Sequence, residues 1–319
     1  MRYRKLGRTA LNVSEIGFGA WGIGGKQWLG GEDQAALRAL RTARDNGINF
    51  YDTALAYGDG HSERLIGKAF AVADDVVIAS KVPPRNRIWP AKGSIREVFP
   101  KEYVLSSLDE TLRNLGRDAV DLYQFHVWTD GWAGDEEWIE TVSQMKSSGK
   151  VRYIGVSLGE HTPTDSLKAL GSGLVDTVQV IYNLFDQSPE DELFPYCLEQ
   201  NIGVLARVPF DEGSLTGKVR PDTIFPDGDF RNFYFRGDRK QESWERVQQL
   251  TASLGIRTEE LPGIALRFCL SDAAVSTVIP GMRSPEHVAS NAKVSDAGPL
   301  PALMLAAARK HRWVRNYYQ

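Results

Sequence analysis

The stretch "INFYDTALAYGDGHSERLIGKAFAVADDVVIASK", residues 48–81, decides the fold. It opens with a short apolar run, "INFYDT", passes through a segment expected to be helical over 62–72, and ends in a second run, "DVVIASK". The core of that second run is apolar on both faces, which is typical of a parallel strand covered on both sides. The order strand, helix, strand predicts a βαβ unit and therefore a parallel sheet.

The same alternation continues along the rest of the chain. The other apolar runs are "LNVSEIG" (11–17), "AVDLYQFH" (119–126), "RYIGVS" (152–157), "TVQVIY" (177–182), "IGVLARV" (202–208) and "VSTVIPG" (275–281). Helix-like segments lie at 33–46, 101–115, 134–148, 163–171, 190–200, 241–254, 258–271 and 285–292. Eight such units fit a closed barrel better than an open doubly wound sheet. We therefore expect an α/β fold, a (β/α)8 TIM barrel with an N-terminal capping segment and a long loop after strand seven.

The composition, 42% hydrophobic and 25% charged, is ordinary for a globular protein. No linker or change in composition divides the 319 residues, so we expect one domain over 1–319. Lys and Arg number 38 against 41 Asp and Glu, and no run of like charge predicts a nucleic-acid or membrane partner. No apolar run approaches the ~20 residues of a membrane helix. The two cysteines have no metal-like spacing, which favours a reducing, cytoplasmic compartment.

The glycine-rich segment "GFGAWGIGG", residues 17–25, contains the pattern G-x-G-x-x-G. That pattern binds dinucleotides where it ends a strand and opens a helix. Here four more glycines follow Gly22 before a helix begins near Asp33, and the next strand-end acid, Asp52, lies too far along. We interpret the segment as a turn leaving the first strand, where the backbone approaches a ligand at the barrel mouth.

Four proton-handling side chains fall at successive strand ends, where barrel enzymes place their active sites. Asp52, with Tyr57 five residues on, follows the second strand, Lys81 ends the third and His126 the fourth. Each alone fits a structural role, but their joint placement favours a site. Lys81 should lower the pKa of the Tyr57 phenol, Asp52 should keep the lysine charged, and His126 could hydrogen-bond the carbonyl oxygen. The set has no nucleophile or metal ligands, so a hydride must come from a cofactor.

Five segments resemble those of a known family. They are "GINFYDTALAYGDGHSERLIG" (47–67), "VVIASK" (76–81), "DLYQFH" (121–126), "GKVRYIGVS" (149–157) and "IPGMRSPEHVASN" (279–291). In order and spacing the sequence resembles the aldo-keto reductases over nearly the whole chain. The resemblance implies an NADPH-dependent reductase that converts small aldehydes and ketones to alcohols, with Asp52, Tyr57, Lys81 and His126 as the catalytic residues.

The resemblance also implies a set of cofactor contacts. They are Ser157 and Gln179 for the carboxamide, Trp21 and Arg207 near the nicotinamide, Gly213, Ser214, Leu215 and Lys218 for the pyrophosphate, and Gly281, Arg283, Ser284, His287 and Asn291 for the adenosine end. Three positions depart from the pattern of many relatives: Leu158 replaces an Asn, Arg207 a Tyr, and His287 an Arg or Gln. We expect NADPH, with NADH as the less favoured cofactor.

The substrate pocket is expected to be aromatic, which suits apolar or aromatic aldehydes. The candidates are Trp21, Trp28, Trp89, Trp128, Phe185 and Phe210, of which Trp28 and Trp89 fit a covering role at the barrel end at least as well. The segment 208–240 is rich in Phe, Tyr and Arg, which favours an ordered lid. The C-terminal "HRWVRNYYQ" (311–319) could reach the pocket as a flap or pack beneath the helices.

Three alternative functions stay open at this point. The chain could be a cofactor-binding redox sensor or subunit with little turnover, resembling ion-channel β-subunits. It could be a sugar or polyol dehydrogenase in which Tyr57 acts as base. A Schiff-base enzyme using Lys81 is disfavoured because Asp52 would keep that lysine protonated. The natural substrate and the oligomeric state are not predicted.

Overall fold

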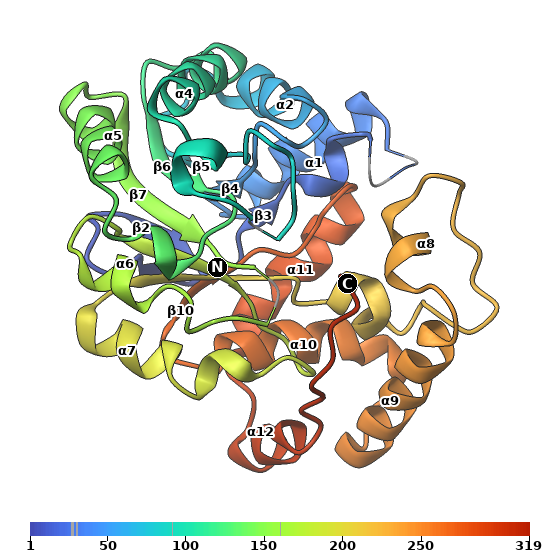
Figure 1. Ribbon diagram of the computed structural model, residues 1–319. Coiled ribbons are helices and arrows are strands. Elements are labelled where there is room, and N and C mark those ends of the chain that lie inside the picture. Colours follow the sequence, from blue (N-terminus) through green and yellow to red (C-terminus); the bar gives the residue numbers. More distant parts are fainter. Residues whose placement is uncertain (27–28, 30, 91, 160) are drawn as a thin grey trace.

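The computed structural model describes residues 1–319 except 27, 28, 30, 91 and 160, so the candidate Trp28 lies outside the described residues. Eight parallel strands form one curled sheet in the order β3 to β10, with the helices around it (Figure 1). The strands are β3 (Phe18–Gly19), β4 (Phe50–Asp52), β5 (Val77–Val82), β6 (Val120–Phe125), β7 (Val151–Ser157), β8 (Thr177–Ile181), β9 (Gly203–Arg207) and β10 (Val275–Val278).

The edges of this sheet meet, which closes it into the expected (β/α)8 barrel. Isolated parallel bridges join Ile16 to Val278 and Gly19 to Gly281. The amide of Gly17 donates to the carbonyl of Val278 at 2.8 Å. A Cβ at Gly19 would lie 2.7 Å from the carbonyl oxygen of Ile279, so only glycine allows this approach. Closure places all the strand ends around one mouth.

The helices follow the expected alternation. They are α1 (Asp33–Asp45), α2 (His61–Phe70), α4 (Lys101–Leu115), α5 (Glu136–Ser147), α6 (Leu167–Gly171), α7 (Leu193–Gln200), α9 (Arg239–Leu254), α10 (Leu261–Leu270) and α11 (Pro285–Ala297). Three helices were not expected: α3 (Ile95–Val98), α8 (Phe230–Tyr234) and α12 (Ala302–Arg309). The first two are only one turn long, and too few residues show a helical period there.

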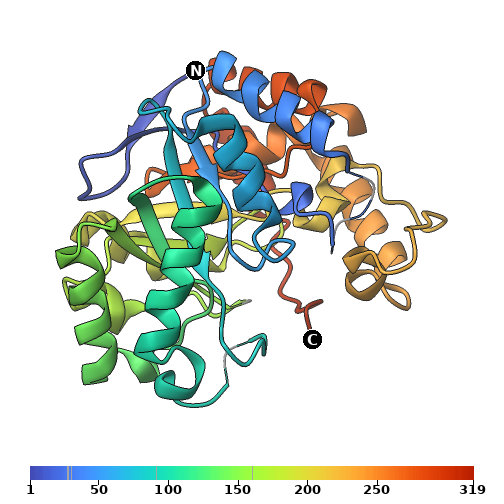
Figure 2. The ribbon, with the colours of Figure 1, turned by 90° about the horizontal axis from the view of Figure 1, so that it is seen from above.

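The first barrel strand was predicted only in part: Ile16 and Gly17, at the end of "LNVSEIG", bond to Val278 of β10, but the start of the run does not join the barrel wall. Part of "LNVSEIG" forms β2 (Asn12–Ser14), which pairs antiparallel with β1 (Tyr3–Lys5), and the barrel strand is the short β3. The hairpin's apolar side chains enter the barrel interior instead of joining its wall. Leu6, Leu11 and Val13 pack there against Phe50, Leu122 and Leu205. This confirms the N-terminal capping segment, and Figure 2 shows it toward the end of the barrel opposite the C-terminus.

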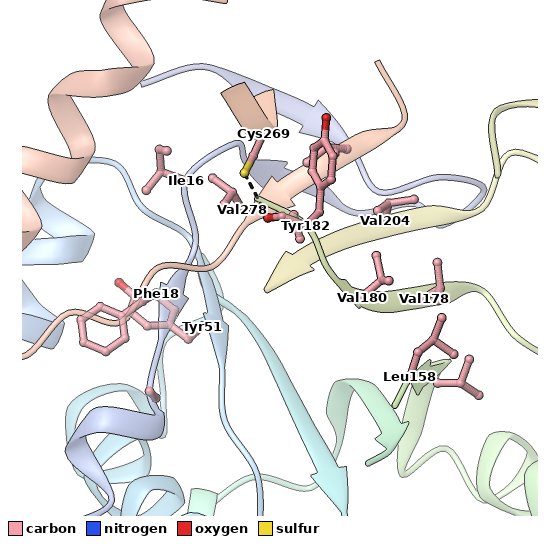
Figure 3. Close-up of a cluster of buried hydrophobic side chains, with 14 of the residues drawn as sticks. Ile16, Phe18, Tyr51, Leu158, Val178, Val180, Tyr182, Val204, Cys269 and Val278 are labelled. Atoms are coloured by element: carbon pink, nitrogen blue, oxygen red, sulfur yellow. Dashed lines mark hydrogen bonds between the residues drawn. The ribbon is translucent and has the colours of Figure 1, made fainter. Parts of the chain in front are cut away.

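The main core lies between the sheet and the surrounding helices. Val178, Val180 and Val204 belong to it, together with Tyr182, which follows β8 (Figure 3). Cys269 of α10 is buried there and donates to the carbonyl of Tyr182 at 3.3 Å. Strands β8 and β9 thus present apolar side chains to the helices. Their polar residues Gln179 and Arg207 line the cavity at the barrel mouth.

The glycine-rich segment does not open a long helix. It contains β3 and continues into a 3-10 turn, η1 (Trp21–Ile23), and α1 begins only at Asp33. The interpretation as a non-Rossmann turn is confirmed, although Gly17 and Gly19 serve the strand contact before the turn. None of the helices in the described part of the chain is long and apolar enough to cross a membrane.

The long segment after β9 spans 208–238. It holds a 3-10 stretch, η4 (Asp211–Thr216), and then α8. The other 3-10 turns are η2 (Asp130–Trp132), η3 (Ser188–Glu190) and η5 (Thr258–Glu260). The segment 208–238 contributes to a separate buried cluster, which contains Val219, Phe225, Tyr234 and Phe235 together with Tyr317 of the C-terminal tail. The expected long loop after strand seven is therefore a packed structure.

Candidate active site

A buried lysine lies between a carboxylate and a phenol at the barrel mouth. Lys81 is 0% exposed, and its Nζ lies 2.6 Å from Asp52 Oδ2 and 3.3 Å from the Tyr57 hydroxyl. It also donates to the carbonyl of Thr53 at 2.8 Å. The register of β4 and β5 brings the strand ends together, because Asp52 lies opposite Ala79, two residues before the lysine. The structure thus joins three of the four predicted catalytic residues directly.

The pKa values of this group depend on burial and on the ion pair. Burial by itself lowers the pKa of Lys81, but Asp52 and Tyr57 outweigh it, and the pKa is raised above its ordinary value. Burial also raises the pKa of Tyr57, and Lys81 only partly opposes this. The expected net lowering of the Tyr57 pKa was therefore wrong, because desolvation of the phenolate exceeds the attraction of the lysine. At neutral pH the phenol keeps its proton and is a donor.

His126 completes the predicted set. Its ring centroid lies 5.5 Å from that of Tyr57, and its backbone amide donates to the carbonyl of Val82 at 3.0 Å. Burial and then the charges of Lys81 and Arg207 hold the pKa of His126 well below its ordinary value. The imidazole is therefore neutral at physiological pH and can donate one hydrogen bond without adding a charge.

Asp52 is oriented by two amides from neighbouring strands. Gln179 Nε2 donates to Asp52 Oδ1 at 2.8 Å, and Gln124 Nε2 donates to the same oxygen at 3.3 Å. Gln179 was predicted as a cofactor contact, and this bond gives it a second role. Gln124 was not predicted, although it lies one residue before the end of β6 and two before His126. Both amides fix the carboxylate that holds Lys81.

One cavity of about 1230 Å³ opens at this mouth. The predicted residues that line it are Asp52, Tyr57, His126, Trp21, Trp89, Ser157, Gln179, Arg207, Phe210, Gly213, Lys218, Gly281, Arg283, His287 and Asn291. Lys81 does not line the cavity, because it is fully buried behind Tyr57, whose hydroxyl it contacts at 3.3 Å. Leu158, the departure from the expected Asn, also lines the cavity, and its carbonyl accepts from Arg207 at 3.0 Å.

Besides Lys81, five predicted residues do not line the cavity. Ser214 donates to Asp211, Leu215 is buried in the core, and Ser284 caps α11 by accepting from the amide of His287. Trp128 packs against Phe125 and Trp138, and Phe185 packs against Trp313. Aromatic content alone does not tell which way a ring points. Trp89, by contrast, lies with its ring 4.7 Å from that of His126 and faces the cavity.

Three basic side chains, Lys218, Arg283 and His287, line the cavity. Burial, then the charges of Lys218 and Arg283, lower the pKa of His287. Arg283 also donates to the backbone carbonyl of Leu29 at 2.8 Å, which fixes its direction. Basic groups that line a cavity favour a phosphate there.

The start of the segment after β9 has a strained backbone. Val208, Asp211 and Glu212 have φ angles of 55°, 50° and 54°, a region costly for side-chain-bearing residues and rare for a β-branched one. Such residues cost roughly 1–3 kcal/mol each and persist where surrounding contacts hold them. This strained stretch forms part of the cavity wall through Glu212 and Gly213.

The C-terminal tail holds that stretch in place. Arg315 donates to Asp211 at 2.5 Å, and the Tyr318 hydroxyl donates to Glu212 at 2.6 Å. Tyr318 itself lines the cavity and stacks near Phe230 at 6.2 Å. The question left open for "HRWVRNYYQ" is thus answered: the tail reaches the cavity. The sequence signal was its density of aromatic and arginine residues.

The arrangement fits a nicotinamide dinucleotide. The cavity lining includes Lys218, Arg283 and His287, which offer donors for the phosphates of such a cofactor. Two buried nitrogens on its wall, His126 Nδ1 and Arg207 Nε, have no hydrogen-bond partner among the described residues. Buried polar atoms of this kind are expected where a ligand supplies the missing partner.

Comparison with known proteins places these features in context. Residues 15–312 match the family model described as "Aldo/keto reductase family". The chain is 30% identical over 304 residues to aldo-keto reductase YhdN of Bacillus subtilis, covering 92% of this chain and 89% of that protein. It is 28% identical over 308 residues to the NADH-specific methylglyoxal reductase of Escherichia coli, covering 91% and 92%. The solved holo structure of aldo-keto reductase AKR11C1 from Bacillus halodurans has a TM-score of 0.77 at 28% identity, with 100% of both chains covered.

Proposed function

Since the chain belongs to the aldo/keto reductase family, we propose that it reduces aldehydes and ketones with NADPH, using Tyr57 as the general acid. One observation carries this proposal: the fully buried Lys81 joins Asp52 to the Tyr57 hydroxyl, which faces the cavity. A buried lysine needs such a carboxylate partner. The phenol beside it keeps its proton at neutral pH, because burial raises its pKa, and its residue lines the cavity, whereas Lys81 does not.

Each residue has a distinct part in the proposed reaction. The bound nicotinamide would supply the hydride. Tyr57 gives its proton to the carbonyl oxygen as negative charge develops there, and Lys81 stabilises the phenolate that results. His126, being neutral, donates a hydrogen bond to the same oxygen and helps to orient the carbonyl. Asp52 keeps Lys81 charged and in place.

The proposed cofactor is NADPH because of the basic side chains that line the cavity. Lys218, Arg283 and His287 provide donors for a 2′-phosphate, next to the N-terminus of α11. Ser157 and Gln179 would hold the carboxamide, and Arg207 would lie near the nicotinamide. The E. coli relative is specific for NADH, so this preference needs its own measurement.

The cytoplasm is the compartment that we propose. Cys197 and Cys269 are both free and buried, and burial raises the pKa of Cys197 to about 12, so neither thiol is reactive. Two unreactive thiols suit a reducing environment.

The proposed function is tested by following the absorbance of NADPH and of NADH as purified protein reduces 4-nitrobenzaldehyde. We expect the rate of aldehyde reduction to be higher with NADPH than with NADH when each cofactor is supplied alone. Binding of each nucleotide is measured in parallel by quenching of tryptophan fluorescence, since Trp21 and Trp89 line the cavity. Tight NADPH binding without turnover on any carbonyl compound would contradict the proposal and support a sensor on the same scaffold.

A further inference from the structure

A guanidinium at the barrel mouth has no part in the proposed proton transfer. Arg207 ends β9, lines the cavity and forms no ion pair within the described part of the chain. Its Nη2 donates to the carbonyl of Leu158 at 3.0 Å, and its buried Nε has no hydrogen-bond partner among the described residues. A buried polar atom without a partner is costly, so the presence of this group in a binding cavity needs an explanation.

A short series of contacts connects Arg207 to the catalytic group. Leu158, whose carbonyl accepts from Arg207, donates its amide to the carbonyl of Gln179 at 2.9 Å. The Gln179 side chain in turn donates to Asp52 at 2.8 Å. Arg207 and Gln179 lie on the neighbouring strands β9 and β8, and both line the cavity. The guanidinium therefore belongs to the same mouth as the residues proposed to carry the reaction.

The charge of Arg207 also acts on the two residues proposed to contact the carbonyl oxygen. Burial raises the pKa of Tyr57, and Lys81 and then Arg207 oppose that rise. Burial, then Lys81, then Arg207 lower the pKa of His126. The electric field of Arg207 thus extends over the place where the carbonyl group of a substrate has to lie.

The other charges around this place are balanced, neutral or screened. Lys81 pairs with Asp52 at 2.6 Å. Glu212 keeps its proton up to about pH 7, because burial raises its pKa. Arg87 also lines the cavity, but it is exposed, so water and salt screen its charge. Below pH 7, Arg207 therefore gives the described residues around the reacting groups a net positive charge.

The proposed reaction changes the charge of the nicotinamide ring. The ring is neutral in NADPH and positively charged in NADP+. Hydride transfer requires the ring to lie against the carbonyl group, and hence close to Tyr57 and His126. A fixed cation in a partly desolvated site repels a charged ring and has little effect on a neutral one.

We propose that Arg207 makes the site select NADPH over NADP+, because its guanidinium repels the oxidised nicotinamide. NADP+ then competes poorly with NADPH for the site, which suits a protein that works in the direction of carbonyl reduction. The inference rests on the proposed reductase function. It disfavours the alternative of a polyol dehydrogenase, which has to bind NADP+ before its substrate can react.

The test compares the dissociation constants of NADPH and NADP+, measured by isothermal titration calorimetry at about pH 6, where Glu212 keeps its proton. We expect wild-type protein to bind NADPH at least about fivefold more tightly than NADP+, the effect of one charge several ångströms away in a medium of intermediate dielectric constant. Arg207→Met should remove most of this preference, mainly by tightening the binding of NADP+. Arg207→Lys keeps the positive charge and should retain most of it.

Two further variants distinguish charge from structure. Arg207→Gln can still donate to the Leu158 carbonyl but carries no charge, so it should lose the preference as Arg207→Met does. Arg283→Met is the matched control, because Arg283 also lines the cavity but is proposed to bind the 2′-phosphate, which NADPH and NADP+ share. It should weaken both nucleotides by a similar factor and leave the ratio of their dissociation constants unchanged.

The outcomes separate this inference from the proposed function. If wild-type protein binds NADPH and NADP+ equally, or binds NADP+ more tightly, Arg207 does not select the reduced cofactor. The same conclusion follows if Arg207→Met and Arg207→Gln weaken both nucleotides alike and leave the ratio as in wild type. In each of these cases the inference fails while the reductase function stands. If neither nucleotide binds to wild-type protein, the reductase function fails and the inference fails with it.

Discussion

At the scale of single residues, the site depends on charges held away from water. Lys81 is buried with Asp52, and removing either partner would leave the other charge uncompensated. Glu212 is buried and forms no ion pair with the described residues, and burial raises its pKa to about 7. The partner of Asp52 is the Lys81 ammonium at 2.6 Å, whereas that of Glu212 is the neutral Tyr318 phenol.

The raised pKa of Glu212 predicts how stability changes with pH. The folded protein holds the Glu212 proton to about pH 7, whereas the unfolded chain releases it near its ordinary value of 4.5. Stability associated with this group is therefore lost as pH rises between those values, and stays lost above them. Glu212→Gln should raise the Tm at pH 8 relative to wild type and leave it nearly unchanged at pH 4. Scanning calorimetry at both pH values checks this, and an equal shift at both would contradict it.

The basic side chains of the cavity lining predict the cofactor preference. Arg283→Ala should weaken NADPH binding by at least about tenfold, since a charged hydrogen bond to a phosphate is lost, and should change NADH binding much less. Fluorescence titration with both nucleotides measures this. Equal weakening of both would remove Arg283 from the 2′-phosphate site, because the residue would then act only through its bond to Leu29.

At the scale of elements, the tail and the segment after β9 form one unit. Asp211 and Glu212 are bound by Arg315 and Tyr318, about a hundred residues later in the chain. The Arg315 guanidinium also lies 4.3 Å from the Trp313 ring. The tail therefore supports a strained wall of the cavity, together with Ser214 and Tyr234, which also donate to Asp211.

The ion pair of Arg315 with Asp211 predicts that two variants in the tail differ in their free energy of unfolding. The side chains of Arg315 and Asp211 are 7% and 3% exposed, so Arg315→Met should lower the free energy of unfolding by about 3–5 kcal/mol. Arg312 pairs with Asp191 on the surface, and Arg312→Met should cost no more than about 1 kcal/mol. Urea unfolding of both variants measures this difference. Equal decreases in the free energy of unfolding would show that the Arg315–Asp211 pair contributes little to stability.

The sequence predicted some elements and missed others for physical reasons. Asp52, Tyr57, Lys81 and His126 were found because parallel strands bring their carboxyl ends together, whatever the details of packing. The strand "LNVSEIG" was partly misplaced because an apolar run does not show whether its partner is a barrel strand or a hairpin. Glu212 was missed because its role depends on a contact with Tyr318, 106 residues away. No local pattern encodes such a contact.

At the scale of the whole molecule, the cavity is bounded by parts of the entire chain. Trp21 comes from near the N-terminus, His126 from the middle and Tyr318 from the C-terminus. We propose that the chain is one domain for this reason. It should unfold in a single thermal transition whose Tm rises with NADPH concentration, because the cofactor binds only the folded state. Two separate transitions, with NADPH moving only one, would contradict a single domain.

The central claim is that Tyr57, supported by Lys81 and Asp52, is the proton donor of the reaction. Single-turnover reduction of 4-nitrobenzaldehyde by NADPH-loaded Tyr57→Phe, beside wild type, tests it most directly. The rate should fall by at least about a hundredfold, the usual contribution of a general acid. NADPH affinity should stay within about twofold of wild type, because the lost hydroxyl acts on the carbonyl oxygen. A rate close to that of wild type would show that another group protonates the product and that Tyr57 is not the acid.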